Sequence, residues 1–368
     1  MYPALAVVEA LYRHNSDGVQ VVFVGTSDGF ERPLLAESGI SFAAQHAVMA
    51  GPLNGVGVAR AVISLLKLGI GVLQAFGLLL RYRPKAVLMT GGWANVPLAV
   101  AGWVLRVPML AYLPDIEPAL TLKALAKVAG KVAVTVGASS AYFRDGQTVV
   151  TGYPLRETML KATREAGLAH FALDGARPIL LVFGGSRGAR RINLALERVL
   201  PDVLALGVQV LHVTGTLDWE RSQGTTAGMR SADYRAFPYL HDDMGLAMAC
   251  ADLAVCRAGA STLGELPHFG LPSVLVPLAD AWRYQQVNAE YLATHGAGVV
   301  LADERMADEL LPLLRQLLAD TVELKAMAER ARALAVDDGA KAIADVWRRM
   351  AGLAVGDRAP IDEMKAHD

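Results

Sequence analysis

A regular alternation of short apolar runs with helical patterns constrains the fold most. Candidate strands rich in Val, Leu and Ile form two separate series along the chain. The first series covers residues 19–24, 86–89, 109–112, 132–136 and 148–151. The second covers residues 179–183, 208–213, 233–237, 253–256, 273–276 and 298–301. Apolar strands separated by helices are typical of parallel sheets buried on both faces. The alternation therefore predicts an α/β protein with two doubly wound, Rossmann-like domains and a cleft between them.

The break between the two series lies at Gly152-Tyr153-Pro154. We therefore expect an N-terminal domain over residues 1–152 and a C-terminal domain over residues 153–338. A last helix over residues 339–353 is expected to cross back to the first domain, and residues 354–368 to form a frayed polar tail. A length of 368 residues suits two domains.

Composition excludes several classes of function. The net charge of −1 gives no general attraction to nucleic acid. The chain has two cysteines, Cys250 and Cys256, in or beside a candidate strand, and we interpret them as reduced core residues of a cytoplasmic protein. The sequence shows no Cys/His cluster with metal-ligand spacing, so we expect no metal ion and no cofactor.

The segment from residue 38 to residue 114 contains no Asp or Glu. Within it, residues 58–81 are almost wholly apolar, and the small or polar residues recur at helical spacing. These are Arg60, Ser64, Lys67, Gly71, Gln74 and Arg81. The stripe and the central Lys67 predict a helix that the protein covers on one side and that rests on an anionic membrane surface with the other. A helix buried in the domain, with Lys67 reaching outward, is the alternative.

Residues 255–265 read Val-Cys-Arg-Ala-Gly-Ala-Ser-Thr-Leu-Gly-Glu. A strand, a tight turn of small residues and a helix start predict backbone amides aimed at phosphate. Glu265, one helical turn later, can accept hydrogen bonds from two sugar hydroxyls. A sugar nucleotide is thus one interpretation, and an ordinary capping box over residues 262–265 is the other. The candidate residues for binding the sugar nucleotide, which is the donor in a sugar transfer, are Arg257, Ala260, Ser261, Thr262, Leu263, Gly264 and Glu265.

A second glycine-containing turn, Gly184-Gly185-Ser186, follows the first strand of the second series. Close backbone approach and the Ser186 hydroxyl predict a phosphate-contacting loop, with a plain structural turn as the alternative. Further donor-side candidates are polar or loop residues that follow strands or the hinge. They are Arg156, Leu240, Gln285 and Asn288.

Two turns of the first domain follow strands and should face the cleft. Gly91, Gly92 and Asn95 could contact an acceptor diphosphate, or form a structural turn. Asp115, in Tyr-Leu-Pro-Asp-Ile-Glu, could act as a general base toward an acceptor hydroxyl, or cap the helix that begins near residue 120.

Taken in order, these segments resemble the MurG family of N-acetylglucosaminyltransferases of peptidoglycan synthesis, which have the GT-B fold. The resemblance rests on Gly-Tyr-Pro-Leu-Arg, Gly-Gly-Ser-Arg-Gly-Ala-Arg, Asp-Asp-Met, the run over residues 256–265 and Gln-Gln-Val-Asn-Ala. It implies an inverting, metal-independent transfer from UDP-N-acetylglucosamine to undecaprenyl-diphospho-muramoylpentapeptide, a polyprenyl-diphosphate-linked acceptor. It also implies a peripheral location on the cytoplasmic face of the cell membrane.

The same resemblance assigns roles on the donor side. Glu265 would hold the ribose, residues 260–264 and Ser186 would line the diphosphate, and Leu240 would contact the uracil. Arg156 would lie beside the nucleotide, and Gln285 would read the sugar.

Two departures from the family pattern affect the acceptor side. The family begins with a strand and a Gly-rich loop ending in His, whereas the match here begins at Tyr2-Pro3. We therefore expect the native chain to start further upstream. Tyr112-Leu113-Pro114-Asp115 also stands where the family usually has His-Glu-Gln-Asn. The alternatives are a GT-B transferase for another lipid-linked acceptor, a UDP-N-acetylglucosamine 2-epimerase, and a non-catalytic UDP-sugar binder.

Overall fold

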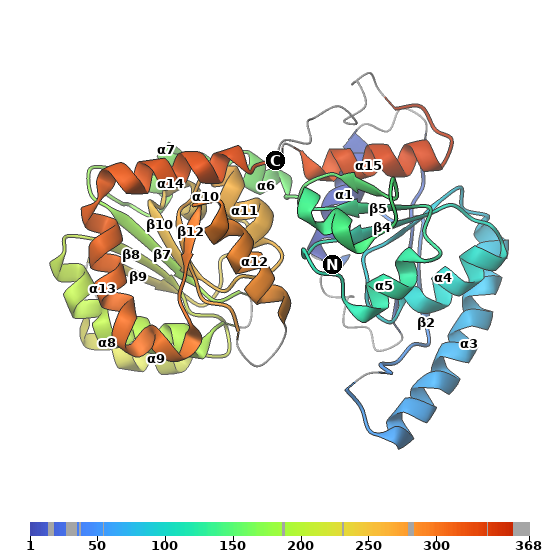
Figure 1. The fold of residues 1–368 in the computed structure, drawn as a ribbon, viewed down its shortest axis with the longest axis horizontal. Helices are drawn as coiled ribbons and strands as arrows, with labels where there is room; N and C mark the ends of the chain where they lie inside the picture. The colour runs from blue at the N-terminus through green and yellow to red at the C-terminus, as the bar shows by residue number, and fades with distance from the viewer. Residues whose placement is uncertain are drawn as a thin grey trace.

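The computed structural model describes residues 1–13, 18–26, 35–36, 38–53, 55–185, 188–229, 232–278, 283–336 and 338–355. Its strands in these ranges form two bodies that lie side by side (Figure 1). Residues 356–368, most of the expected polar tail, lie outside the described residues.

The C-terminal body contains a six-stranded parallel sheet in the order β12-β11-β10-β7-β8-β9. Its strands are β7 (Ile179–Phe183), β8 (Gln209–Val213), β9 (Tyr234–Phe237), β10 (Leu253–Cys256), β11 (Ser273–Leu275) and β12 (Gly298–Val300). Every residue of β7, β8 and β10 is buried. Successive residues of β7 enter different apolar clusters on the two sheet faces, which explains the unbroken apolar run.

Helices cover this sheet and complete its layers. They are α6 (Glu157–Leu160), α7 (Arg164–His170), α8 (Arg190–Ala205), α9 (Trp219–Thr226), α10 (Met244–Cys250), α11 (Thr262–Phe269), α12 (Arg283–Thr294), α13 (Met306–Ala319) and α14 (Thr321–Ala333). The 3₁₀ turns are η2 (Ala227–Met229) and η3 (Asp303–Arg305). The sequence pattern also predicts helices over residues 190–200 and 305–320, and these correspond to α8 and α13.

The N-terminal body contains two parallel sheets. One pairs β1 (Val22–Thr26) with β2 (Ala44–Val48), and the other has the order β3-β4-β5-β6. The latter strands are β3 (Val87–Met89), β4 (Met109–Leu113), β5 (Lys131–Val134) and β6 (Thr148–Val150). The sequence did not predict β2, whose residues Ala-Gln-His-Ala-Val give a weak strand signal.

The helices of this body are α1 (Tyr2–Arg13), α3 (Val58–Tyr82), α4 (Asn95–Val104) and α5 (Leu120–Ala126), together with the 3₁₀ turn η1 (Gly137–Tyr142). The last helix, α15 (Gly339–Met350), packs against α1 and β4 of the N-terminal body, whereas α14 lies on the C-terminal one (Figure 1). Ile343 and Ala344 of α15 are buried with Val7 of α1.

Helix α3 extends from the N-terminal body along its outer side (Figure 1). By length and composition alone it could cross a membrane. In its most apolar stretch of 18 residues, 28% of the residues are buried inside the protein. Its inward face consists of Ser64, Leu68, Gly71, Ala75 and Leu79. Its outward face is apolar, and Leu65, Leu66 and Leu73 are 62%, 66% and 72% exposed. The alternative of a buried helix is therefore wrong.

Candidate active site

The C-terminal sheet reverses its strand order between the central strands β7 and β10. Open α/β sheets bind ligands outside the carboxyl ends of the strands at such a switch point. The loops that leave these two ends, over residues 184–189 and 257–261, are the glycine-containing turns identified from the sequence. Gly188 has φ +82°, and an added Cβ would lie 2.2 Å from the carbonyl oxygen of Thr214, so the first loop requires glycine there. Ser186 lies outside the described residues.

The turn between β10 and α11 is wound tightly on itself. The amides of Thr262, Leu263 and Gly264 donate to the carbonyls of Gly259, Ala260 and Ser261 in that order, at 3.0 to 3.3 Å. Within the described part of the chain, no residue accepts from the amides of residues 259–261. The amides available to an anion are therefore those of the turn, not those of the first helical turn.

The capping-box interpretation is wrong in its assignment of Thr262. Thr262 is the first residue of α11, and its hydroxyl donates to the carbonyl of Gly259 at 2.6 Å, so it caps no helix amide. The side chain that interacts with Glu265 is Ser261, one residue earlier. Leu263 is buried in the core, and Gly264 packs on Tyr153, where an added Cβ would lie 2.3 Å from the Tyr153 Cβ.

Glu265 lies in the first turn of α11 and is partly buried. Burial raises its pKa above the usual 4.5, while the Ser261 hydroxyl and the charge of Arg156 oppose that rise. Arg156 is fixed by two hydrogen bonds, from Nη1 to Asp242 Oδ1 at 2.9 Å and from Nη2 to the His241 carbonyl at 3.0 Å. Hydrogen bonds from the hydroxyls of a ligand would stabilise the ionised form of such a buried carboxylate.

Two further donor-side candidates have structural contacts. The Arg257 guanidinium donates to Asp303 Oδ1 at 2.5 Å and to the Val276 carbonyl at 3.1 Å, and these contacts hold it on the side of η3. The side chain of Leu240 is buried in the core with 6% exposure. A base could therefore meet its main chain, but not its side chain.

Asn288 joins the two bodies. Its Nδ2 donates to Asp115 Oδ1 at 2.9 Å and to the Ala258 carbonyl at 3.2 Å, and its Oδ1 accepts from the Ile116 amide at 3.2 Å. The side chain is fully buried, so these bonds engage the amide of this donor-side candidate at the junction. Gln285 is partly buried, and its Oε1 accepts from the Leu278 amide at 3.0 Å.

Asp115 lies at the end of β4, against the C-terminal body. Burial raises the pKa of its carboxyl above the usual 3.8, and the hydrogen bond from Asn288 partly opposes this. A carboxylate with a raised pKa is a better proton acceptor, and its position after a strand end suits a general base. It does not cap α5, whose N-cap is Ala119 and has no side-chain cap bond.

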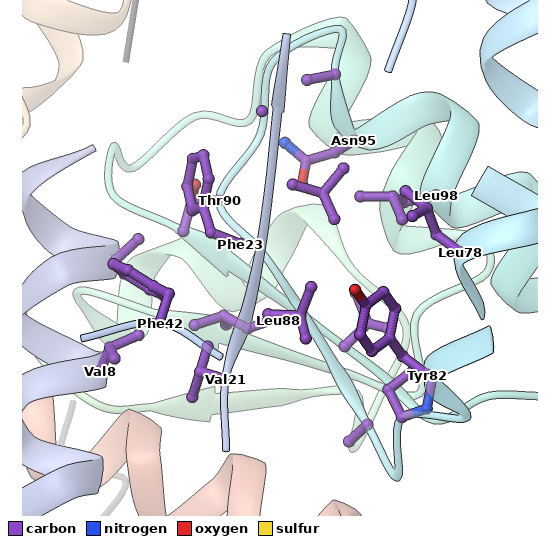
Figure 2. Close-up of a pocket in the computed structure, with 18 of the residues that line it drawn as sticks. Val8, Val21, Phe23, Phe42, Leu78, Tyr82, Leu88, Thr90, Asn95 and Leu98 are labelled. Atoms are coloured by element: carbon purple, nitrogen blue, oxygen red, sulfur yellow. The ribbon is translucent and has the colours of Figure 1, made fainter. Parts of the chain in front are cut away.

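The turn after β3 has left-handed glycines at Gly91 and Gly92, with φ +87° and +83°. The side-chain amide of Asn95 donates to the carbonyl of Gly91, so it closes the turn from within. An acceptor group could therefore contact the main chain of Gly91 and Gly92, but not the amide group that Asn95 uses within the turn. The three residues line one cavity, which extends under α1 (Figure 2).

Sequence reasoning missed a group of tyrosines at the junction of the two bodies. Tyr2 of α1 lies under the Arg156 guanidinium, 5.3 Å from the ring centre, and its hydroxyl pairs with that of Tyr239. Tyr153 packs on Gly264 near the Glu265 carboxylate. The signal available was the Gly-Tyr-Pro hinge itself. In the described ranges, no group of three His, Cys, Asp or Glu side chains is placed to hold a metal ion.

Comparisons with known proteins cover nearly the whole chain. The glycosyltransferase family 28 N-terminal domain matches residues 1–134, and the C-terminal domain of that family matches residues 179–343. A Roseiflexus protein named UDP-N-acetylglucosamine--N-acetylmuramyl-(pentapeptide) pyrophosphoryl-undecaprenol N-acetylglucosamine transferase is 36% identical over 94% of this chain and 91% of its own. A protein of the same name from Geobacter sulfurreducens is 35% identical, with 94% of each chain covered.

Solved structures agree with the fold. The crystal structure of MurG from Acinetobacter baumannii covers 95% of both chains with a TM-score of 0.72 at 26% identity. UDP-N-acetylglucosamine 2-epimerase from Neisseria meningitidis, solved with UDP-N-acetylglucosamine, has a TM-score of 0.64 at 13% identity. The second similarity shows the shared architecture alone.

Proposed function

This chain belongs to the MurG family of GT-B glycosyltransferases, and we propose that it transfers N-acetylglucosamine from UDP-N-acetylglucosamine to N-acetylmuramyl-(pentapeptide) pyrophosphoryl-undecaprenol. It is an N-acetylglucosaminyltransferase of peptidoglycan synthesis, as its relatives are named. The observation that carries the assignment of the donor site is the position of Glu265 beside Arg156 at the switch point of the C-terminal sheet.

The donor would bind across the carboxyl ends of β7 and β10. The amides of residues 259–261 suit the diphosphate, because within the described residues none of them donates to another group, and Gly185 of the other turn is exposed. Glu265 would accept hydrogen bonds from the ribose hydroxyls. Arg156, already held by Asp242, would add positive charge near the nucleotide.

The reaction is a direct displacement at the anomeric carbon. A hydroxyl of the acceptor sugar forms the new C–O bond as the bond to UDP breaks, and Asp115 would take the hydroxyl proton. UDP leaves with both bonding electrons, and the turn amides would stabilise the growing negative charge on its diphosphate. Gly91 and Gly92 would face the acceptor from the other body.

The acceptor's lipid sets a further requirement, because its polyprenyl chain stays in a membrane. The exposed apolar face of α3 meets that requirement, and Trp103 and Val104 of the adjacent α4 are also exposed, at 62% and 52%. The basic residues of this region, without acidic ones from residue 38 to 114, suit an anionic leaflet. We propose that this face rests on the cytoplasmic side of the cell membrane.

The test uses purified protein, UDP-N-acetylglucosamine and the lipid acceptor in detergent. We expect UDP release only when the acceptor is present. Formation of the manno epimer would favour an epimerase instead, and binding of UDP-N-acetylglucosamine without turnover would favour a non-catalytic binder.

Glu265→Ala should weaken donor binding at least tenfold, since lost charged hydrogen bonds cost about 1.5–3 kcal/mol. Calorimetry with UDP-N-acetylglucosamine measures this. Glu329→Ala, at an exposed site on α14, is the matched control and should bind normally. Equal affinity in the two variants would remove Glu265 from the donor site.

A further inference from the structure

The loops around the proposed donor site follow neighbouring strands of the C-terminal sheet, which lie in the order β12-β11-β10-β7. The ladder hydrogen bonds between parallel strands stop where the strands end, so they do not fix the loops beyond. Contacts between side chains can fix the separation of such loops. The structure shows one set of contacts that joins the segments after all these strands.

The centre of this set is the carboxylate of Asp303, in η3 shortly after β12. Its side chain is buried, with 2% exposure. Its Oδ1 accepts a hydrogen bond from Nη1 of Arg257, directly after β10, at 2.5 Å. Its Oδ2 accepts from Nη1 of Arg191, in the first turn of α8, at 2.7 Å. We call Asp303, Arg257 and Arg191 the Asp303 cluster.

Arg257 extends the connection to the remaining strand. Its Nη1 also donates to the carbonyl of Val276, directly after β11, at 3.1 Å. A buried carboxylate needs cations and hydrogen bonds to compensate for the water that it has lost. Guanidinium groups bonded to a carboxylate are also fixed in direction as well as distance. The cluster therefore holds the chain at the exits of β12, β11 and β10 and at the start of α8 in one arrangement.

Two of the joined segments flank the proposed position of the diphosphate. Arg257 begins the turn over residues 257–261, in which the amides of residues 259–261 suit an anion. Arg191 lies at the start of α8, directly after the glycine-containing turn over residues 184–189. A diphosphate that contacts both turns requires them at one separation, and a site that is already arranged for its ligand binds more tightly.

We propose that Asp303 is a positioning residue for the donor, which sets the separation of the two diphosphate-binding turns through Arg257 and Arg191. The inference rests on the proposed donor site and adds to it a residue that acts only through others. A nucleoside monophosphate can bind at one turn alone, whereas a diphosphate uses both. The cluster should therefore control the preference of the site for UDP over UMP.

The first test measures UDP and UMP binding to the full chain by calorimetry. Asp303→Asn keeps the shape of the side chain and one acceptor oxygen, but it removes a negative charge. By charge alone, this change would strengthen the binding of an anion. We expect the opposite, a loss of about tenfold or more in UDP affinity, with UMP affinity within about threefold of wild type.

The matched control for Asp303→Asn is Asp233→Asn. Asp233 pairs with Arg177 at 2.6 Å, and both residues lie just before strands, at the opposite edge of the same sheet. The control therefore also breaks an ion pair in this body, but away from the donor loops. Both of its affinities should match those of wild type.

A second variant tests the inference without disturbing a buried group. Arg191→Gln breaks only the link to α8, and its side chain is 60% exposed, so we expect the variant to fold. Arg190→Gln is its control, because it removes the same charge one residue earlier, and Arg190 lies near Asp218 instead. UDP affinity should fall at least about threefold further in Arg191→Gln than in Arg190→Gln, with equal UMP affinities.

The ratio of UDP to UMP affinity decides the outcome. A ratio lowered in Asp303→Asn and Arg191→Gln, but not in their controls, would support the inference. A ratio that stays at the wild-type value in both variants would overturn it, even if both affinities fall together, because a purely structural role would weaken both ligands alike. Wild-type protein that binds no UDP would refute the proposed donor site itself and this inference with it.

Discussion

Replacing Asp115 by Asn separates the two roles that the structure allows this residue. The Asp115 carboxylate accepts a hydrogen bond from Asn288 across the junction, and it is also the proposed general base. The Asn side chain keeps an oxygen that can accept the same bond, but it cannot take a proton.

The expected loss is kinetic. A positioned general base contributes about 10²–10⁴ in rate, so kcat should fall by at least about a hundredfold. The hydrogen bond to Asn288 changes from charge-assisted to neutral, which costs about 1 kcal/mol. Loss of a carboxylate whose pKa is raised by burial offsets part of that cost. Binding of UDP-N-acetylglucosamine should stay within about threefold, equivalent to less than 1 kcal/mol.

The pH dependence has a defined sign. A base works when deprotonated, so the wild-type rate should fall as the pH drops through the raised pKa of Asp115. For stability the same shift acts in the opposite direction. A group whose pKa is raised in the folded state stabilises the fold at pH values below its unfolded-state pKa, and this stabilisation is lost as the pH rises through its folded-state pKa. At pH 7, removing this buried charge should therefore offset part of the cost of the weaker hydrogen bond, and Asp115→Asn should unfold within about 1 kcal/mol of wild type.

The assay is UDP release with lipid acceptor, measured across pH 4 to 8 at saturating donor. Glu117→Gln, two residues away, is the matched control and should keep its rate and its acid limb. If Asp115→Asn kept the wild-type rate within about threefold and the same acid limb, the carboxylate would not be the base.

Two further predictions concern α3. Gly71→Ala should lower stability by about 1–3 kcal/mol in thermal melts, because its Cβ would lie 2.0 Å from the Met49 carbonyl oxygen. Gly69→Ala meets nothing within 4 Å and should be neutral or stabilising; equal melts would argue against this packing. Leu73→Glu should reduce co-sedimentation with anionic vesicles about tenfold or more while donor affinity holds, since Leu73 is 72% exposed. Unchanged sedimentation would mean that this face does not bind lipid.

The sequence predicts best those strands in which every residue is buried, because such strands appear as unbroken apolar runs. The bounds of β7 and β10 follow directly from their apolar runs, because every residue in them is buried. Strand β2 alternates between partly buried and exposed residues, and its Ala, Gln and His gave no such run. The sequence could place the glycine turns after β7 and β10, but only the sheet order shows that these strands lie side by side at the switch point.

Side-chain roles were harder to predict, because partners distant in the chain compete for the same groups. Arg257 stands in the predicted phosphate turn, yet Asp303, 46 residues later, takes its guanidinium. Asn288 is a donor-side candidate by sequence, yet Ile116 and Asp115 of the other body form hydrogen bonds with its amide. Residue type predicted that these groups would be hydrogen-bonded, and only the tertiary arrangement determines to what.

Helix α3 shows why periodicity predicts a helix but not its orientation. The stripe of small and polar residues would ordinarily face water, with the apolar residues in the core. Here Ser64 and Gly71 face inward, because they admit the main chain of residues 49–51, whereas Leu65, Leu66 and Leu73 face outward. Close backbone packing therefore decides the orientation, and it leaves an apolar surface that gains free energy by leaving water. The same packing that fixes α3 on the domain thus favours its contact with lipid.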